Sequence, residues 1–219
     1  MVRRGRPRFP LPSIVGTHSG RYLYLNDWHR LKIAVIDLDG PDPQAIDAIP
    51  FESAAFDMVV SPDDRFIYAA LLSEDAVAVI DTTAVPWAIQ KFPVANGPSG
   101  LALSADGKRL FVAQNGKPNP PTSGSLSVLD TSTMQGPTVD TARGSADVVI
   151  NVAESRAYVS NASDDTVSVV DISGTPTLVA TITGFHSPGN MSISADGHRL
   201  YVAQFEFLQP SRGIAVVAI

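Results

Sequence analysis

Five small or polar residues recur along the chain at nearly constant intervals, and most of them could bind a ligand. They are Ser13, Asp57, Gly100, Asp147 and Asn190, separated by 44, 43, 47 and 43 residues. Two carboxylates, an amide and a hydroxyl could orient a polar ligand or hold a hard cation such as Ca²⁺ through oxygen ligands. The competing interpretation is that these residues cap the exposed start of a strand and face water. We therefore predict no resident cofactor, with Ca²⁺ as the alternative.

Two histidines with aromatic neighbours form a second candidate site. His29 follows Trp28, and His186 follows Phe185. A histidine pair could bind a metal or act as an acid and a base, because imidazole titrates near neutral pH. The two residues lie far apart in the sequence, so contact between them requires the chain to close on itself. Otherwise they are ordinary surface-loop histidines.

A third recurring set predicts structure instead of chemistry. Each of its aspartates ends a short apolar run such as VAVID or VSVVD; the set is Asp37, Asp81, Asp130 and Asp171. An aspartate side chain can accept hydrogen bonds from the amides of a following turn. A turn that occurs once in every repeat requires its aspartate at the same interval, so the recurrence of these aspartates indicates a structural role.

Three apolar residues cluster near the C-terminus, namely Phe205, Phe207 and Leu208. An apolar patch in a loop that differs between repeats is typical of a partner or ligand surface. The same side chains could instead pack on a neighbouring part of the fold.

The elements that position these residues are short strands in a repeat. SPDDRFIYA from Ser61, SADGKRLFVA from Ser104, NVAESRAYVS from Asn151 and SADGHRLYVA from Ser194 are copies of one pattern, and THSGRYLYL from Thr17 is a weaker copy. Apolar runs of four to six residues alternate with Pro, Gly, Asn and Asp clusters, which predicts strands and turns. For the second repeat we expect strands at 58–60, 67–71, 76–80 and 89–94. Four strands in a unit of this length indicate the blades of a β-propeller.

The segments SADGKRLFVAQN, RAYVSN with TVSVVDI, and SADGHRLYVAQ resemble the YVTN β-propeller repeat of surface-layer-type and lactonase-like propellers. The resemblance covers nearly the whole chain after residue 12. It implies an all-β propeller of four-stranded antiparallel blades. Members of the family commonly have about seven blades, whereas five repeats are recognisable here and the last lacks its fourth strand. The chain is therefore expected to be either a closed five-bladed ring or a fragment of a larger propeller.

Composition indicates a folded domain over residues 13–219 and a basic tail over residues 1–12. The net charge is −6, and removing the four arginines of the first eight residues leaves −10 for the rest. An acidic body makes nucleic acid an improbable partner. The tail is expected to be disordered or to supply an edge strand. The chain has no cysteine and no apolar run that predicts a membrane span or a secretory signal. The compartment stays open, since the resemblance also allows an extracytoplasmic protein.

The sequence supports two hypotheses about function. The first is a non-enzymatic binding or scaffold module that presents one loop face to a protein, a surface polymer or a small ligand. That face carries the connections entering the first strand of each blade and those joining the second to the third strand. The alternative is a lactonase-like hydrolase with a divalent-cation or substrate site at the channel mouth. The repeated residues build the fold, and one fold hosts unrelated activities.

Overall fold

The computed structural model describes residues 13–27, 29–51, 53–84, 86–116, 122–151, 153, 155–205 and 213–219. The basic tail, Trp28, Phe207 and Leu208 lie outside the described residues. Among those that are described, no helix is long and apolar enough to cross a membrane.

The described residues form five antiparallel sheets, which confirms the all-β prediction. The first sheet comprises β1 (Ile14–Gly16), β2 (Tyr22–Asp27), β3 (Lys32–Asp37) and β4 (Gln44–Pro50). The second comprises β5 (Met58–Val60), β6 (Phe66–Leu71), β7 (Ala76–Asp81) and β8 (Ala88–Pro93), with a short 3₁₀ turn, η1 (Leu72–Glu74). The third comprises β9 (Pro98–Leu103), β10 (Arg109–Gln114), β11 (Ser125–Asp130) and β12 (Thr138–Asp140). The fourth comprises β13 (Ser145–Ile150), β14 (Arg156–Asn161), β15 (Thr166–Asp171) and β16 (Thr177–Thr183). The fifth has β17 (Pro188–Ile193), β18 (Arg199–Gln204) and β19 (Ile214–Ala218).

The turn between the first two strands of a sheet is fixed by its own side chains. Ser61 donates a hydrogen bond from Oγ to Asp63 Oδ1, and the same Oγ accepts the amide of Phe66 at 2.8 Å. The third and fifth sheets repeat both bonds. Such side-chain bonds give the backbone a turn in place of a longer strand. In these three sheets the Ser-x-Asp pattern therefore sets where the first strand ends and the second strand begins.

Strand bounds in the second repeat agree with the sequence prediction to within one residue. The first strand is as predicted, and β6 starts one residue earlier, at Phe66. β7 ends one residue later, while β8 is shifted by one residue toward the N-terminus. Differences of this size are normal at strand ends.

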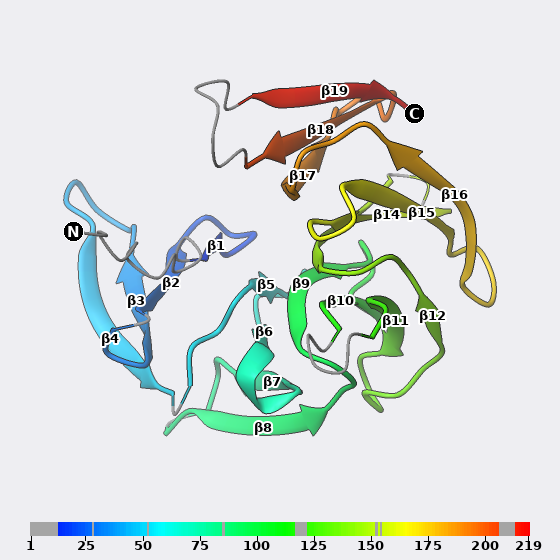
Figure 1. Cartoon of the computed structure of the whole chain (residues 1–219). Coiled ribbons are helices and arrows are strands. Elements are labelled where there is room, and N and C mark those ends of the chain that lie inside the picture. The colour runs from blue at the N-terminus through cyan, green and yellow to red at the C-terminus, as the bar shows by residue number, and fades with distance from the viewer. Residues whose placement is uncertain are drawn as a thin grey trace, which may run out of the picture.

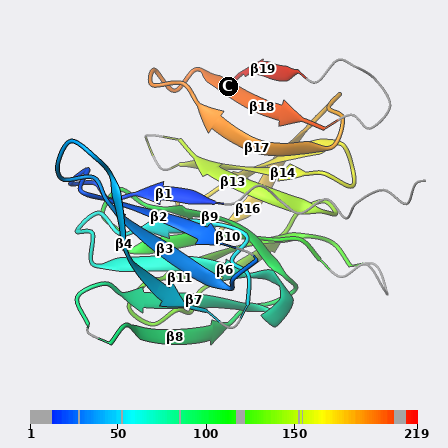
Figure 2. The same cartoon turned by 90° about the vertical axis from the view of Figure 1, so that its left-hand side faces the viewer.

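The sheets follow one another around a curved path, with the first strand of each sheet innermost (Figure 1). β5 packs beside β1 and β9, and β13 packs beside β9 and β17. No comparable packing joins β17 to β1 within the described part of the chain. Figure 2 shows the same sheets from the side, with the fifth sheet at one end of the stack.

The core lies between the sheets in four apolar clusters, one for each pair of neighbours. In each of the first four sheets an aromatic residue at the third position of the second strand contacts the following sheet: Tyr24, Tyr68, Phe111 and Tyr158. All four are buried. Burying one large apolar side chain contributes about 1.5–3 kcal/mol, so these contacts are a main source of cohesion between sheets.

Candidate functional site

The loop face is held together by two aspartates that the sequence reasoning missed. Asp75 Oδ1 accepts the amide of Gly97 at 2.7 Å, and Asp165 Oδ1 accepts the amide of Ser187 at 2.6 Å. Each bond joins a connection between second and third strands to one that enters the next first strand. Both aspartates adopt a left-handed backbone, with φ of 51° and 57°. The available signal was an Asp directly before the third strand in the second and fourth repeats.

Asp57 lies at the start of β5 and connects three sheets. Its Oδ1 accepts the Ser13 hydroxyl at 3.1 Å and the Met58 amide at 2.8 Å. Its Oδ2 accepts the amide of Leu101, in the following sheet, at 2.8 Å. The predicted pair of Ser13 and Asp57 is therefore brought into contact, and the carboxylate joins the inner strands of consecutive sheets.

Asp147 repeats this arrangement two sheets later. Its Oδ1 accepts the amide of Val148 at 2.8 Å, and its Oδ2 accepts the amide of Met191 at 2.7 Å. Met191 follows Asn190, just as Leu101 follows Gly100. Asp57 and Asp147 are thus more than water-facing caps, because each ties its own inner strand to the next one.

Gly100 occupies the position between the two aspartates for a steric reason. A Cβ built on Gly100 would lie 2.6 Å from Asp147 Cα and 3.0 Å from the carbonyl oxygen of Ala146. No side chain fits at this separation. The third and fourth sheets therefore meet backbone to backbone at the inner edge, where a third aspartate would clash.

The surrounding protein changes the pKa of both carboxyl groups, Asp57 and Asp147. Burial raises the pKa of Asp57, and hydrogen bonds from Leu101, Met58 and Ser13 partly offset this rise. Burial, followed by the negative charge of Asp57, raises the pKa of Asp147 to about 7. Asp147 is therefore present in both protonation states near neutral pH, and it can accept or donate a hydrogen bond.

Asp147 also lines an open groove of about 550 Å³ on the inner side of the sheets. The groove runs along β13 and β17 and includes Val149, Met191 and Ile193. Asn190 lies at the same end as Asp147; its side chain is exposed and has no hydrogen-bond partner among the described residues. The groove thus combines an apolar wall with an ionisable carboxyl group and an available amide.

The donor set does not fit Ca²⁺. All four carboxylate oxygens of Asp57 and Asp147 already accept hydrogen bonds, whereas Ca²⁺ needs six to eight oxygen ligands directed at one point. Within the described ranges, no group of three or more His, Cys, Asp or Glu residues is arranged to hold a metal.

The two histidines lie at opposite ends of the series of sheets. His29 lies between β2 and β3 of the first sheet, and His186 lies just before β17 of the fifth. Both side chains are exposed. The backbone amide of His186 donates to Gln204 Oε1 at 2.8 Å, which fixes the loop by its backbone.

Phe205 contacts its own sheet. A Cβ on Gly189 would lie 2.2 Å from Phe205 Cε2, so the ring rests on the glycine backbone at the start of β17. The amide of Phe205 donates to the carbonyls of His186 and Ser187 at 3.2 and 3.3 Å. The ring remains 43% exposed, so it still offers an apolar surface beside His186.

The aspartates that end the third strands have the predicted structural role. In three of the turns the aspartate accepts both the amide and the hydroxyl of the residue two positions later; these aspartates are Asp81, Asp130 and Asp171. Asp37 accepts the amide of Asp39. Hydrogen bonds from the Thr83 hydroxyl and amide, with Arg65 adding to them, lower the pKa of Asp81 to about 2.

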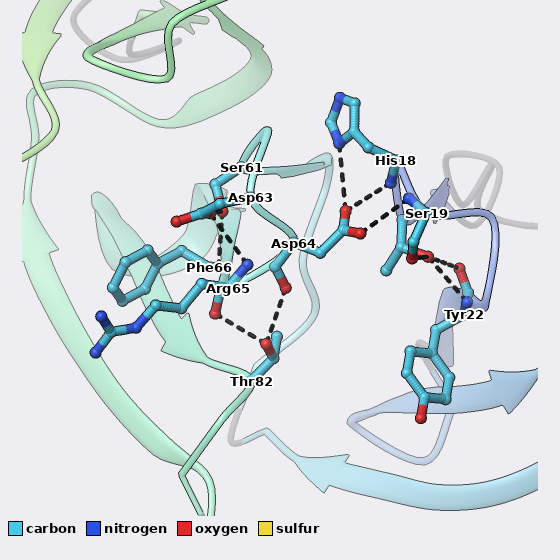
Figure 3. A network of polar contacts seen from close by, with 10 residues as sticks. His18, Ser19, Tyr22, Ser61, Asp63, Asp64, Arg65, Phe66 and Thr82 are labelled. Atoms are coloured by element: carbon cyan, nitrogen blue, oxygen red, sulfur yellow. Dashed lines mark hydrogen bonds and ion pairs between the residues drawn. The ribbon is translucent and has the colours of Figure 1, made fainter.

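A further contact joins the first two sheets on the face opposite the loop face (Figure 3). Asp64 accepts the amides of His18 and Ser19 at 2.6 and 2.9 Å, and Asp64 Oδ1 lies 3.4 Å from His18 Nδ1. Burial acts to raise the pKa of Asp64, but the hydrogen bonds from Ser19 and His18 together outweigh it and lower the pKa below its usual value. Asp64 has φ of 61° where the first, third and fifth repeats have glycine, so its side chain links two turns at a position that favours glycine.

Comparison with known proteins supports the same fold and family resemblance. Residues 117–219 match the family model described as "Lactonase, 7-bladed beta-propeller". A seven-bladed β-propeller protein of Mycobacterium tuberculosis, Rv1057, is 34% identical over 137 residues, which is 60% of this chain and 33% of that protein. The matched part thus spans a third of the length of this curated relative. These findings confirm the resemblance to lactonase-like β-propellers.

Solved structures show the fold. Hydrazine synthase of Kuenenia stuttgartiensis superimposes with a TM-score of 0.75 at 20% identity, over 92% of this chain and 58% of that chain. A candidate 6-phosphogluconolactonase of Bacteroides uniformis gives 0.73 at 14% identity, over 94% of this chain and 67% of that chain. At these identities the likeness extends to the β-propeller fold alone.

Proposed function

We propose that the chain is a binding module that takes a small polar ligand in the groove along β13 and β17. The observation that carries this proposal is the groove itself, in which Asp147 and the unpartnered amide of Asn190 lie at one end of an apolar wall. A volume of about 550 Å³ suits a small molecule, since ligand sites typically measure about 300–1,000 Å³.

The chemistry of the groove defines the ligand. Asn190 offers one acceptor and two donors, and Asp147 can accept or donate near neutral pH. A neutral molecule with several hydroxyl or carbonyl groups matches this set. An anion would meet the negative charges of Asp57 and Asp147, whereas an apolar face of the ligand can rest on Met191 and Ile193.

Isothermal titration calorimetry tests the proposal with glucose, glucono-δ-lactone and gluconate as probes. We expect the two neutral probes to bind better than the anion. Asn190→Ala should weaken binding about 2- to 10-fold, because a lost hydrogen bond to a neutral group removes about 0.5–1.5 kcal/mol. Gln90→Ala is the matched control, since Gln90 is an exposed amide on the outer strand β8. Equal affinities for the two variants would place the ligand elsewhere.

The alternative function is hydrolysis of a lactone. It is favoured by the family match over residues 117–219, which include Asp147, and by a carboxyl group that titrates near the pH at which an acid–base catalyst works best. A pH-stat assay with glucono-δ-lactone tests it. Turnover that is lost in Asp147→Asn, with the folded state retained, would replace the binding proposal by this one. Unchanged hydrolysis in that variant would exclude Asp147 as the catalyst.

A further inference from the structure

The packing between neighbouring sheets follows one directional rule. In the second, third and fourth sheets, one face of the second strand packs on the preceding sheet, and the other face presents an aromatic residue to the following sheet. In β14, for example, Ala157 and Val159 contact the third sheet, while Tyr158 contacts the fifth. Every internal interface thus joins a forward face to a backward face.

The backward face of the first sheet has no sheet against it in the described part of the chain. Val15, Tyr22 and Tyr24 point toward the second sheet, so the residues between them point away from it. Strand pairing places Leu23 opposite Ile36, and Leu25 opposite Ile14. Ile14 is 60% exposed. This apolar face is equivalent to the faces that receive an aromatic side chain elsewhere.

The forward face of the fifth sheet is left open in the same way. Leu200 and Val202 pack on the fourth sheet, so Tyr201 points away from it, opposite Val216. Ile214 and Val216 are 67% and 57% exposed. Tyr201 stands at the position of the four buried aromatic residues, but it is only half-buried.

Polar groups at the fifth sheet complete the pattern. Asn190 is equivalent to Asp57 and Asp147, which accept an amide from the next inner strand, and its own amide group lacks a partner among the described residues. Arg199 is equivalent to Arg109, whose guanidinium donates to the carbonyl of Ile172 in the next sheet at 2.9 Å. The end of the fifth sheet therefore carries the apolar and polar groups of an internal interface.

We propose that the forward face of the fifth sheet binds the backward face of the first sheet in a second copy of this chain. The interface would continue the packing already present four times within the molecule, with Tyr201 covering Leu23 and Leu25. Within one chain the two faces lie apart (Figure 1). The association is head to tail, so each copy still offers one free face to another copy. The proposal rests on the apolar faces of β2 and β18 and needs no ligand in the groove, although Asn190 belongs to both the groove and this interface.

Cysteine cross-linking tests the contact, because the chain has no cysteine of its own. Ser13 contacts Asp57, the equivalent residue one sheet later, so Ser13 of one copy is expected beside Asn190 of the other. Ser13→Cys and Asn190→Cys variants, mixed and oxidised, should give a disulfide-linked heterodimer. Asn190→Cys mixed with Ser173→Cys is the control, since Ser173 is exposed and lies in a turn on the opposite face.

A single chain that carries both Ser13→Cys and Asn190→Cys distinguishes contact between two copies from contact within one chain. A ladder of linked oligomers supports the proposal, whereas a linked monomer shows that the two faces meet within one chain and overturns it. The absence of any cross-link above the control also overturns it.

Sedimentation velocity over a concentration series gives an independent readout. The unmodified chain should shift from monomer toward dimer and longer assemblies as its concentration rises. Val216→Glu should keep the chain monomeric, because it buries an unpaired charge in the interface. Val179→Glu is the matched control, since Val179 is 51% exposed but lies on the outer strand β16. Loss of association in both variants, or in neither, contradicts the proposal.

Discussion

Asp147 shows how one carboxyl group can make the stability of the molecule depend on pH. Its pKa is raised from 3.8 to about 7 in the folded state, so the folded state binds the proton more tightly than the unfolded chain. The stabilisation is fully present below pH 4 and is lost as the pH rises to 7. At about 1.4 kcal/mol for each pKa unit, the loss amounts to about 4 kcal/mol at most.

We therefore expect the free energy of unfolding, measured by urea denaturation, to fall between pH 4 and pH 7. Asp147→Asn should flatten this part of the profile. Asp130→Asn serves as the control, because hydrogen bonds lower the pKa of Asp130 and it stays ionised throughout this range. A profile unchanged by Asp147→Asn would show that another group titrates.

Gly100 tests the close approach of the third and fourth sheets. Gly100→Ala places a methyl group 2.6 Å from Asp147 Cα, and backbone cannot yield as the end of a side chain does. We expect a loss of about 1–3 kcal/mol in the free energy of unfolding, the usual cost of overpacking. Gly174→Ala is the control, because a Cβ there meets no atom within 4 Å. Equal effects of the two substitutions would mean that the inner edge is looser than described.

At the scale of the elements, the contact between the turns of the first two sheets depends on Asp64. Asp64→Ala removes the acceptor for two amides and keeps a left-handed backbone that alanine adopts poorly. We predict a loss of about 1–3 kcal/mol in a denaturant titration. Asp64→Asn retains one acceptor oxygen, so its free energy of unfolding should lie between that of the unmodified chain and that of Asp64→Ala. Full stability in Asp64→Ala would show that the turns are held by the sheets alone.

The elements were also where the sequence was most informative. Apolar runs and Ser-x-Asp turns determine strands locally, so the second repeat was predicted to within one residue. The structural role of Asp130 followed from the same local chemistry. The clamp formed by Asp147 did not, because its partner amide lies 44 residues away and a single sequence does not show which strands become neighbours. Gly100 likewise looked like a gap in a polar series until the separation of the two sheets was known.

At the scale of the whole molecule, equivalent residues should differ in their contribution to stability according to whether a sheet follows. Phe111→Ala empties a fully buried site between the third and fourth sheets and should cost about 3–5 kcal/mol. Tyr201→Ala removes the equivalent ring from a half-open face. It should cost much less in dilute solution, where copies do not associate. Equal losses in urea denaturation would mean that the forward face of the fifth sheet is covered.

The direction of the aspartate clamps bears on the order in which the chain is synthesised. Asp57 and Asp147 each emerge before the amide that they bind in the following sheet, so each carboxylate stays solvated until that sheet has been synthesised. A solvated carboxylate costs little, whereas a strand amide buried early without an acceptor would cost far more. The third and fifth sheets can therefore dock on the finished sheets that carry these aspartates during translation, with the N-terminal sheets folding first.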